Sequence, residues 1–92
     1  MKRKLNIFGA GNVVVPAYLT LQKMGYSVRC ENPVSDHETW IAESDTAILS
    51  ADDVVILLGL ATLAELRGED WKASDAEIQD FLKKYEYDRP VA

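Results

Sequence analysis

Two glycines with one residue between them, in the turn from Gly9 to Asn12, are the feature of this chain whose spacing comes nearest to a chemical function. A glycine turn lets backbone N–H groups approach a ligand closely, and a helix that starts after the turn adds the positive end of its dipole. A short apolar stretch precedes this turn, and a helical pattern follows it. The turn from Gly9 to Asn12 is therefore a candidate for holding a phosphate.

The surroundings of this turn resemble the first half of a dinucleotide-binding fingerprint, where an acid such as Glu31 follows the strand, turn, helix and strand after about 20 residues. The third glycine of that fingerprint falls on Val14, whose branched side chain would keep helix and strand apart. Pro16 predicts that the helix begins there, a turn too late to aim its amides at a phosphate. A small-ligand or nucleotide site at Gly9 to Asn12 is kept as an alternative, and we predict no bound cofactor.

His37 and two pairs of carboxylates are the other residues that could do chemistry. His37 is the single histidine and lies between Asp36 and Glu38. Three consecutive residues do not easily converge on one metal ion, and a general base needs a substrate pocket that the sequence does not name. The pairs Asp52-Asp53 and Glu69-Asp70 flank helical patterns, where acids favour helix starts or solvated loops. We predict no catalytic residue and no metal site, with a small enzyme that uses His37 or a carboxylate as a second alternative.

Trp71 is the best candidate for contact with another protein. It follows Glu69 and Asp70 in the segment between two predicted helices, and Asp75 comes at the start of the second of these helices. Tryptophan is a frequent anchor of protein interfaces, and carboxylates around it would favour a basic partner. Packing of the loop onto the core is the other role open to Trp71. The predicted partner-binding residues are Trp71, Glu69, Asp70 and Asp75.

The acidic charge of the chain is concentrated in its second half. The net charge is −5. Residues 1–49 carry five basic and five acidic side chains, whereas residues 50–92 carry five basic and ten acidic ones. An acidic surface repels nucleic-acid phosphates and anionic lipids. We therefore expect a protein partner, either a second copy of the chain or a basic protein, and neither nucleic acid nor membrane.

Length and composition predict a single domain over residues 1–92, because 48% of the residues are hydrophobic and 27% are charged. The longest apolar run, residues 54–61, is far shorter than the about 20 residues of a membrane span. Asn6, Asn12 and Pro16 interrupt the apolar core that a secretory signal needs. The lone Cys30 cannot form an intramolecular disulfide, which fits a reducing compartment. We expect a cytoplasmic protein.

The order of patterns along the chain predicts an α+β fold. A leading helix from Pro16 to Met24 ends at Gly25. Alternating patterns at residues 27–31 and 38–44, with a short one at 47–49, predict a small antiparallel sheet of two to four strands, because the connections are too short for parallel crossovers. In an alternative α/β arrangement, residues 5–8 add a strand.

Two C-terminal helices complete the predicted fold. The first runs from Ala51 to Arg67 with Ser50 as its N-cap, and its middle is apolar on every side, which is typical of a helix at the centre of a domain. The second opens with the capping box Ser74-x-x-Glu77. An acidic α+β domain without a catalytic constellation is best interpreted as a non-enzymatic protein–protein interaction module, such as an inhibitor- or immunity-like protein or an accessory subunit.

Overall fold

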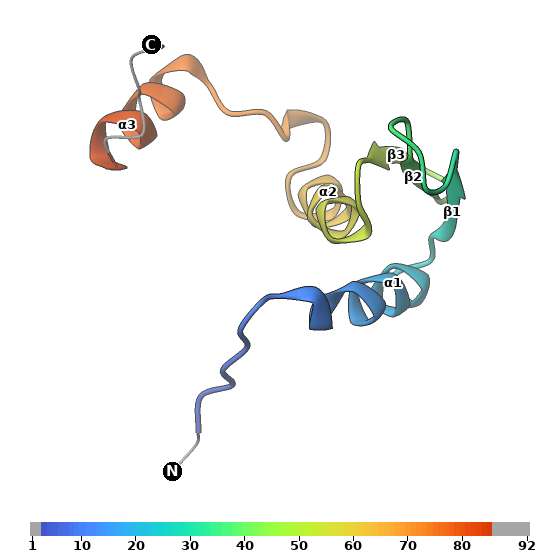
Figure 1. The fold of residues 1–92 in the computed structure, drawn as a ribbon. Helices are drawn as coiled ribbons and strands as arrows, with labels where there is room; N and C mark the ends of the chain where they lie inside the picture. The colour runs from blue at the N-terminus through green and yellow to red at the C-terminus, as the bar shows by residue number, and fades with distance from the viewer. Residues whose placement is uncertain (1–2, 86–92) are drawn as a thin grey trace.

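A computed structural model describes residues 3–85 of the chain (Figure 1). Its elements are η1 (Gly11–Val13), α1 (Val14–Lys23), β1 (Ser27–Glu31), β2 (Thr39–Glu43), β3 (Ile48–Ala51), α2 (Val54–Arg67), η2 (Gly68–Asp70) and α3 (Asp75–Tyr85). A leading helix, a three-stranded antiparallel sheet and two further helices confirm the predicted α+β class.

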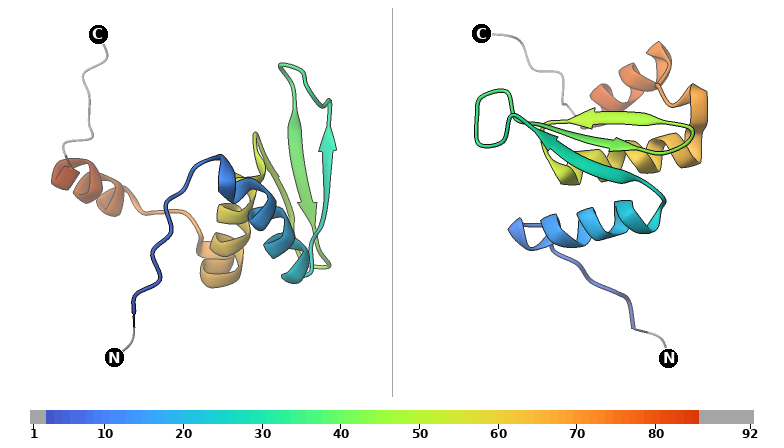
Figure 2. Two further views of the ribbon diagram at one scale, coloured as in Figure 1. Left: turned by 60° about the horizontal axis from the view of Figure 1, so that its bottom comes forward. Right: turned by 90° about the vertical axis from the view of Figure 1, so that its right-hand side faces the viewer.

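The three strands form a meander with β2 in the middle. Cys30 of β1 lies opposite Trp40 of β2, and both strand pairs are antiparallel because residues 32–38 and 44–47 are too few for a crossover. Helices α1 and α2 lie side by side on one face of the sheet (Figure 2). On the opposite face, Arg29 lies 3.2 Å from Glu43 and 3.6 Å from Glu31, so that this face presents ion pairs to solvent.

Helix α1 begins earlier than the sequence predicts. The expected start at Pro16 is wrong, because α1 begins at Val14 and the 3-10 turn η1 precedes it. Pro16 is the third residue of α1, where a backbone N–H has no partner within the helix in any case. The predicted end is confirmed. Gly25 has a φ of +98°, and the N–H groups of Gly25 and Tyr26 donate to carbonyl oxygens three and five residues back, both at 3.0 Å.

Helix α2 has Asp53 as its N-cap. The predicted start at Ala51 and the predicted cap Ser50 are wrong, because both residues pair with β2 as the end of β3. Asp53 has an extended backbone, and its carboxylate accepts a hydrogen bond from the N–H of Ile56 at 2.8 Å. The predicted end at Arg67 is confirmed.

The core lies between the sheet and the two helices that cover it. Four fully buried residues, drawn from α1, β2 and α2, form its centre: Leu21, Ala42, Leu57 and Ala61. Helix α2 supplies two of these four, in agreement with its predicted central position. Burial of α2 on every side is wrong, however, because the apolar side chains on its outer side are exposed: Val55, Ile56, Leu63 and Leu66.

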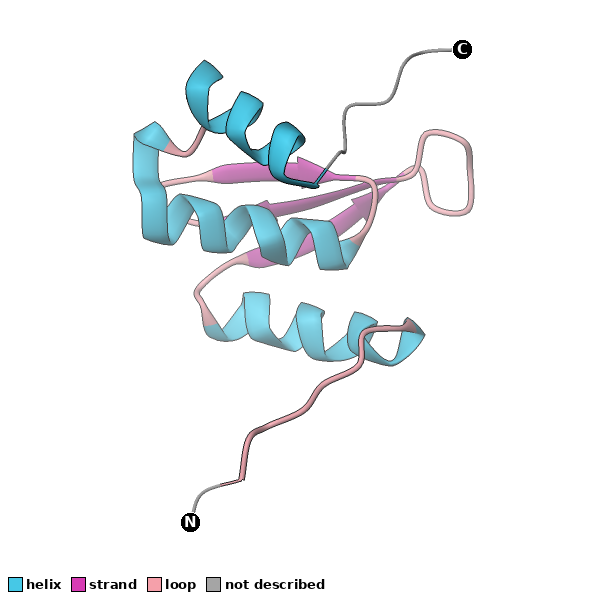
Figure 3. Ribbon diagram, turned by 90° about the vertical axis from the view of Figure 1, so that its left-hand side faces the viewer, coloured by secondary structure: helices cyan, strands magenta, loops and turns pink. Residues whose placement is uncertain are grey.

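Two segments stand away from this core, namely residues 3–10 and α3 (Figures 1 and 2). The alternative in which residues 5–8 add a strand is wrong, because this segment lies away from both edges of the sheet and is loop along its length (Figure 3). Its apolar side chains Leu5, Ile7 and Phe8 are exposed. No residue of α3 is buried.

The capping box at the start of α3 is confirmed. The N–H of Ser74 donates to Oε1 of Glu77 at 2.8 Å, and the N–H of Glu77 donates to Oγ of Ser74 at 3.2 Å. These bonds satisfy two donors that a helix start would otherwise leave free, so α3 has a defined beginning without help from the core.

Candidate functional site

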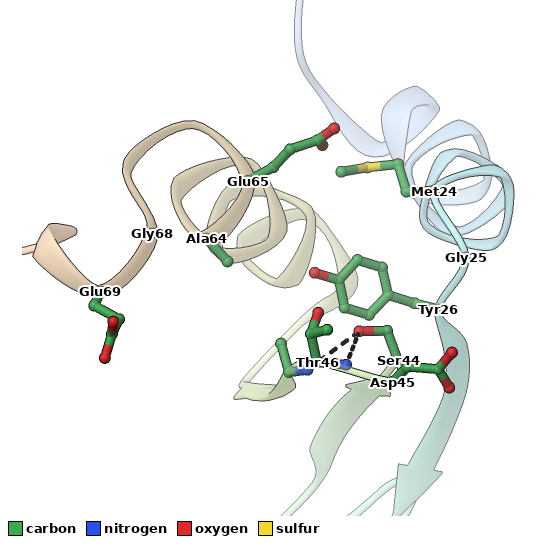
Figure 4. Close-up of a pocket in the computed structure, with 11 residues that line it drawn as sticks. Met24, Gly25, Tyr26, Ser44, Asp45, Thr46, Ala64, Glu65, Gly68 and Glu69 are labelled. Atoms are coloured by element: carbon green, nitrogen blue, oxygen red, sulfur yellow. Dashed lines mark hydrogen bonds between the residues drawn. The ribbon is translucent and has the colours of Figure 1, made fainter.

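A cavity of about 670 Å³ opens where the end of α1, the β2–β3 turn and the end of α2 meet (Figure 4). We call it the acidic cavity, because three carboxylates and no basic side chain are among its described lining residues: Met24, Gly25, Tyr26, Ser44, Asp45, Thr46, Ala47, Ala64, Glu65, Gly68 and Glu69. The carboxylates of Asp45, Glu65 and Glu69 stand at different sides of the opening, and the Tyr26 ring lies between them (Figure 4).

Local hydrogen bonds fix the walls of the acidic cavity. Oγ of Ser44 accepts from the N–H groups of Thr46 and Ala47 at 3.3 and 3.2 Å, and the N–H of Ser44 donates to the carbonyl oxygen of Ala47 at 2.9 Å. These three bonds hold the β2–β3 turn that carries Asp45. The glycine end of α1 turns the chain so that Tyr26 packs against the core. The cavity is thus built from structured elements rather than from a loose loop.

The chemistry of the acidic cavity suits a cationic side chain. A lysine or arginine has a long apolar stem and a charged head, and it can lay its stem on apolar surface while the head stays near water and carboxylates. Tyr26 and Met24 supply the apolar surface, and an aromatic face also attracts a cation. Asp45, Glu65 and Glu69 supply negative charge at the rim.

A second hollow of about 300 Å³, the Trp71 groove, adjoins the acidic cavity. It is mostly apolar and is lined by Ile48, Leu49, Ser50, Leu60, Leu63, Ala64 and Trp71. Ala64 lines both hollows, so the two form neighbouring parts of one surface around the C-terminal half of α2. The Trp71 side chain is thus partly covered, because it lines the groove and remains 47% exposed.

Arg67 holds the segment that carries Trp71. Its Nε donates to the carbonyl oxygen of Trp71 at 3.1 Å, and its Nη2 donates to that of Lys72 at 3.4 Å. The ammonium of Lys72 lies 5.6 Å from the centroid of the Trp71 ring. The Trp71 ring thus has a cation from its own chain over its face, at a distance where cations and aromatic rings attract each other.

The four predicted partner-binding residues do not all lie together. Trp71 lines the groove and Glu69 lines the acidic cavity, while Asp70 lies between them in the exposed turn η2. Asp75 is the first residue of α3 and lines neither hollow. Sequence reasoning missed Glu65 and Asp45 as part of this surface. Glu65 lies only four residues before Glu69, so the sequence could have indicated it, whereas Asp45 joins them only through the tertiary arrangement of α2 and the β2–β3 turn.

The glycine turn of the alternative ligand site has a different setting from the one predicted. The N–H of Ala10 donates to the side-chain oxygen of Asn12 at 3.0 Å, and the helical turn η1 starts at Gly11 rather than after Pro16. A late helix start therefore does not exclude a phosphate at this turn. The fingerprint also requires a strand directly before the turn, and residues 5–8 form none.

His37 lies in the β1–β2 loop and Cys30 lies near the end of β1, and neither residue lines either hollow. His37 is exposed, and its backbone N–H donates to Oγ of Ser35 at 3.1 Å. The thiol of Cys30 has a raised pKa because of desolvation and, to a smaller degree, the negative charges of Glu38 and Glu31. A raised pKa reduces the reactive thiolate fraction. The described residues hold no group of three or more His, Cys, Asp or Glu side chains placed to share a metal ion.

Comparisons with protein-family models, with curated proteins and with solved structures find no match to this chain. Among residues 3–85, no helix is both long and apolar enough to cross a bilayer.

Proposed function

We propose that this protein is a non-enzymatic interaction module that binds a basic protein partner through the acidic cavity and the adjoining Trp71 groove. The observation that carries the proposal is the half-exposed Trp71, which lines an apolar groove next to a cavity rimmed by carboxylates. An apolar anchor beside charges of one sign is the arrangement by which many interfaces combine affinity with choice of partner.

The groove supplies the anchor of the proposed interface. Trp71 has a large ring surface that remains accessible, and Leu60, Leu63 and Ile48 add apolar area around it. An apolar side chain of the partner inserted here would cover the ring and displace water from the groove. The proposed binding energy therefore comes mainly from the groove rather than from the exposed charges, which water and salt screen.

The acidic cavity supplies the selectivity of the proposed interface. A partner that inserts a lysine or arginine between Asp45, Glu65 and Glu69 gains charge-assisted hydrogen bonds, and a partner with an acidic surface is repelled. The excess of acidic over basic residues in the second half of the chain extends this preference beyond the cavity. The proposal also includes a cytoplasmic location, for which the lone Cys30 is the support.

Capture from native lysate with matched variants tests this function. The double variant Glu65→Lys/Glu69→Lys reverses the charge of the acidic cavity, and Asp36→Lys/Asp52→Lys makes the same change in net charge at exposed positions that line neither hollow. We expect the first variant to lose the captured partner and the second to retain it. Trp71→Ala is expected to weaken the captured complex by about 2 kcal/mol or more.

The amount of partner captured at different salt concentrations is an independent test of the proposed interface. A complex steered by carboxylates forms less readily as ionic strength rises, because the charges are screened. Equal loss of the partner in both double variants would mean that net charge alone matters, and no loss in either variant would contradict the proposed surface. A nucleotide-binding chain would instead show saturable NMR shifts confined to residues 8–16.

A further inference from the structure

The outer side of α2 is an apolar surface with a glycine at its centre. We call it the outer face and define it by Val55, Ile56, Gly59, Leu63 and Leu66. At 100° per residue these positions fall on the side of the helix opposite the buried Val54, Leu57 and Ala61. From residue 54 to residue 64 the helix has no charged side chain. The outer face therefore lacks the polar side chains that a solvated helix surface usually carries.

Nothing within the chain itself explains why position 59 is a glycine. A Cβ placed on Gly59 would meet nothing within 4 Å, and its φ is not in the region that favours glycine. Glycine weakens a helix interior compared with alanine, so a glycine in the middle of α2 lowers the stability of the chain on its own. Small residues at the centre of a helix face are useful where another backbone approaches closely. Gly59 is explained if a second helix crosses α2 at this position.

The large apolar side chains that α2 exposes lie on the outer face. Ile56 and Leu66 are the most exposed of them, at 51% and 79%, and Val55 and Leu63 are exposed to a smaller degree. The same face of a second chain would cover all four side chains and have its own four covered in turn.

We propose that the outer face is a two-fold interface with a second copy of this chain, in which the two α2 helices cross at Gly59. A face without charges offers nothing that selects a basic protein, whereas around a two-fold axis the same apolar patch meets itself and needs no charged counterpart. This inference goes beyond the proposed function, because it concerns another surface. Of the outer face, only Leu63 also lines the Trp71 groove.

Sedimentation equilibrium of the full chain over a wide concentration range tests the inference. The wild-type chain is expected to dimerise. Ile56→Glu introduces a charge on the outer face at a side chain that is 51% exposed, and it is expected to give a monomer with unchanged far-UV circular dichroism. Leu19→Glu, at a side chain of α1 that is 55% exposed, is the matched control and is expected to leave the dimer intact.

Gly59→Ala gives the sharper test, because its two expected effects have opposite signs. In the dilute monomer the added methyl group meets open space and favours the helix, so the thermal midpoint is expected to rise. In the dimer the same methyl group separates the two helices, and the dissociation constant is expected to increase about tenfold. If Gly59 had no role in an interface, Gly59→Ala would raise the thermal midpoint and leave the dissociation constant unchanged.

Three results would overturn the inference. One is a chain that stays monomeric at every concentration, whether α3 folds onto the outer face of its own chain or only another protein covers it. Another is a dimer that neither Ile56→Glu nor Gly59→Ala weakens. The third is a dimer that Leu19→Glu dissolves equally. The Glu65→Lys/Glu69→Lys variant keeps the outer face unchanged, so loss of the basic partner and loss of the dimer are separate outcomes.

Discussion

Leu57 has no exposed surface and packs with Leu21, Ala42 and Ala61 at the centre of the core. Leu57→Ala is expected to lower the free energy of unfolding by about 2–5 kcal/mol, because it removes buried methyl groups and leaves a cavity. Since a domain of this size has only about 5–15 kcal/mol in total, one substitution would unfold a measurable share of the molecules.

Chemical denaturation followed by circular dichroism measures the loss at Leu57. Leu66→Ala is the matched control, because the Leu66 side chain is 79% exposed and its truncation is expected to change stability by less than about 0.5 kcal/mol in the dilute monomer. Leu58 and Leu60, in the same apolar stretch of α2, are only partly covered and are expected to give intermediate losses. A loss below about 1 kcal/mol at Leu57 would show that α2 is not central.

Glu38 makes the β1–β2 loop sensitive to acid. The N–H of Val34 donates to its Oε1 at 2.8 Å and the indole N–H of Trp40 donates to its Oε2 at 2.9 Å, and these two bonds lower the pKa of the carboxyl group. A carboxyl group with a lowered pKa in the folded state stabilises that state above its ordinary pKa, and this contribution is lost as the pH falls through the lowered value.

The fluorescence of Trp40 in a Trp71→Phe background reports this titration. We expect a change in Trp40 emission as the pH falls through the lowered pKa of Glu38, since protonation weakens the bond to the indole. Glu38→Gln is expected to abolish that step, because the amide does not titrate. An unchanged step in Glu38→Gln would assign the transition to another group.

At the scale of elements, Asp53 and Ser50 distinguish the observed start of α2 from the one that the sequence predicts. Asp53→Ala is expected to destabilise the chain by about 1 kcal/mol, because it removes the acceptor for the N–H of Ile56. Ser50→Ala tests the discarded cap and is expected to have a much smaller effect, since Ser50 belongs to β3. Thermal or urea unfolding of the two variants measures the difference, and the reverse order of losses would restore Ser50 as the cap.

Elements fixed by neighbouring residues were predictable from the sequence, and those fixed by distant ones were not. The glycine end of α1, the capping box of α3 and the strand from Ser27 to Glu31 depend on residues within one turn or one alternation, and the structure has each of them as predicted. The start of α2 depends on whether Ser50 pairs with Ile41 of β2, which no local pattern reveals. The same applies to residues 5–8, whose apolar character suggests a strand although no sheet edge lies beside them.

The candidate site was predictable only in part, for the same reason. Trp71 and Glu69 stand out in the sequence because they lie in a polar connection between helices. The acidic cavity also needs Asp45 from the β2–β3 turn and Tyr26 from the end of α1. These residues come together only once the sheet and both helices have packed, so their shared role is a property of the tertiary structure.

At the scale of the whole molecule, the connection between α2 and α3 is expected to be the weak point of the chain. Residues 68–74 and all of α3 are without a buried residue, whereas α1, the sheet and α2 share one core. Limited trypsin digestion of the dilute chain is therefore expected to cut first after Lys72 and in the exposed segment at Lys4, since proteases need locally open backbone.

The expected product of that digestion is a resistant fragment of residues 5–72. Arg29 is the internal control, because its side chain is exposed while its backbone is paired in β1. Early cleavage after Arg29 would mean that the sheet opens as readily as the connection to α3. Mass spectrometry of the first products distinguishes the two outcomes.

The meander of β1, β2 and β3 has a consequence for how fast the chain folds. Each strand pairs with its neighbour in sequence, so the sheet closes only short loops and has a low contact order. Of the element pairs that pack together, α1 and α2 are the most distant in sequence. We therefore expect the contact between α1 and α2 to form late in folding, because it closes the most distant contact of the core.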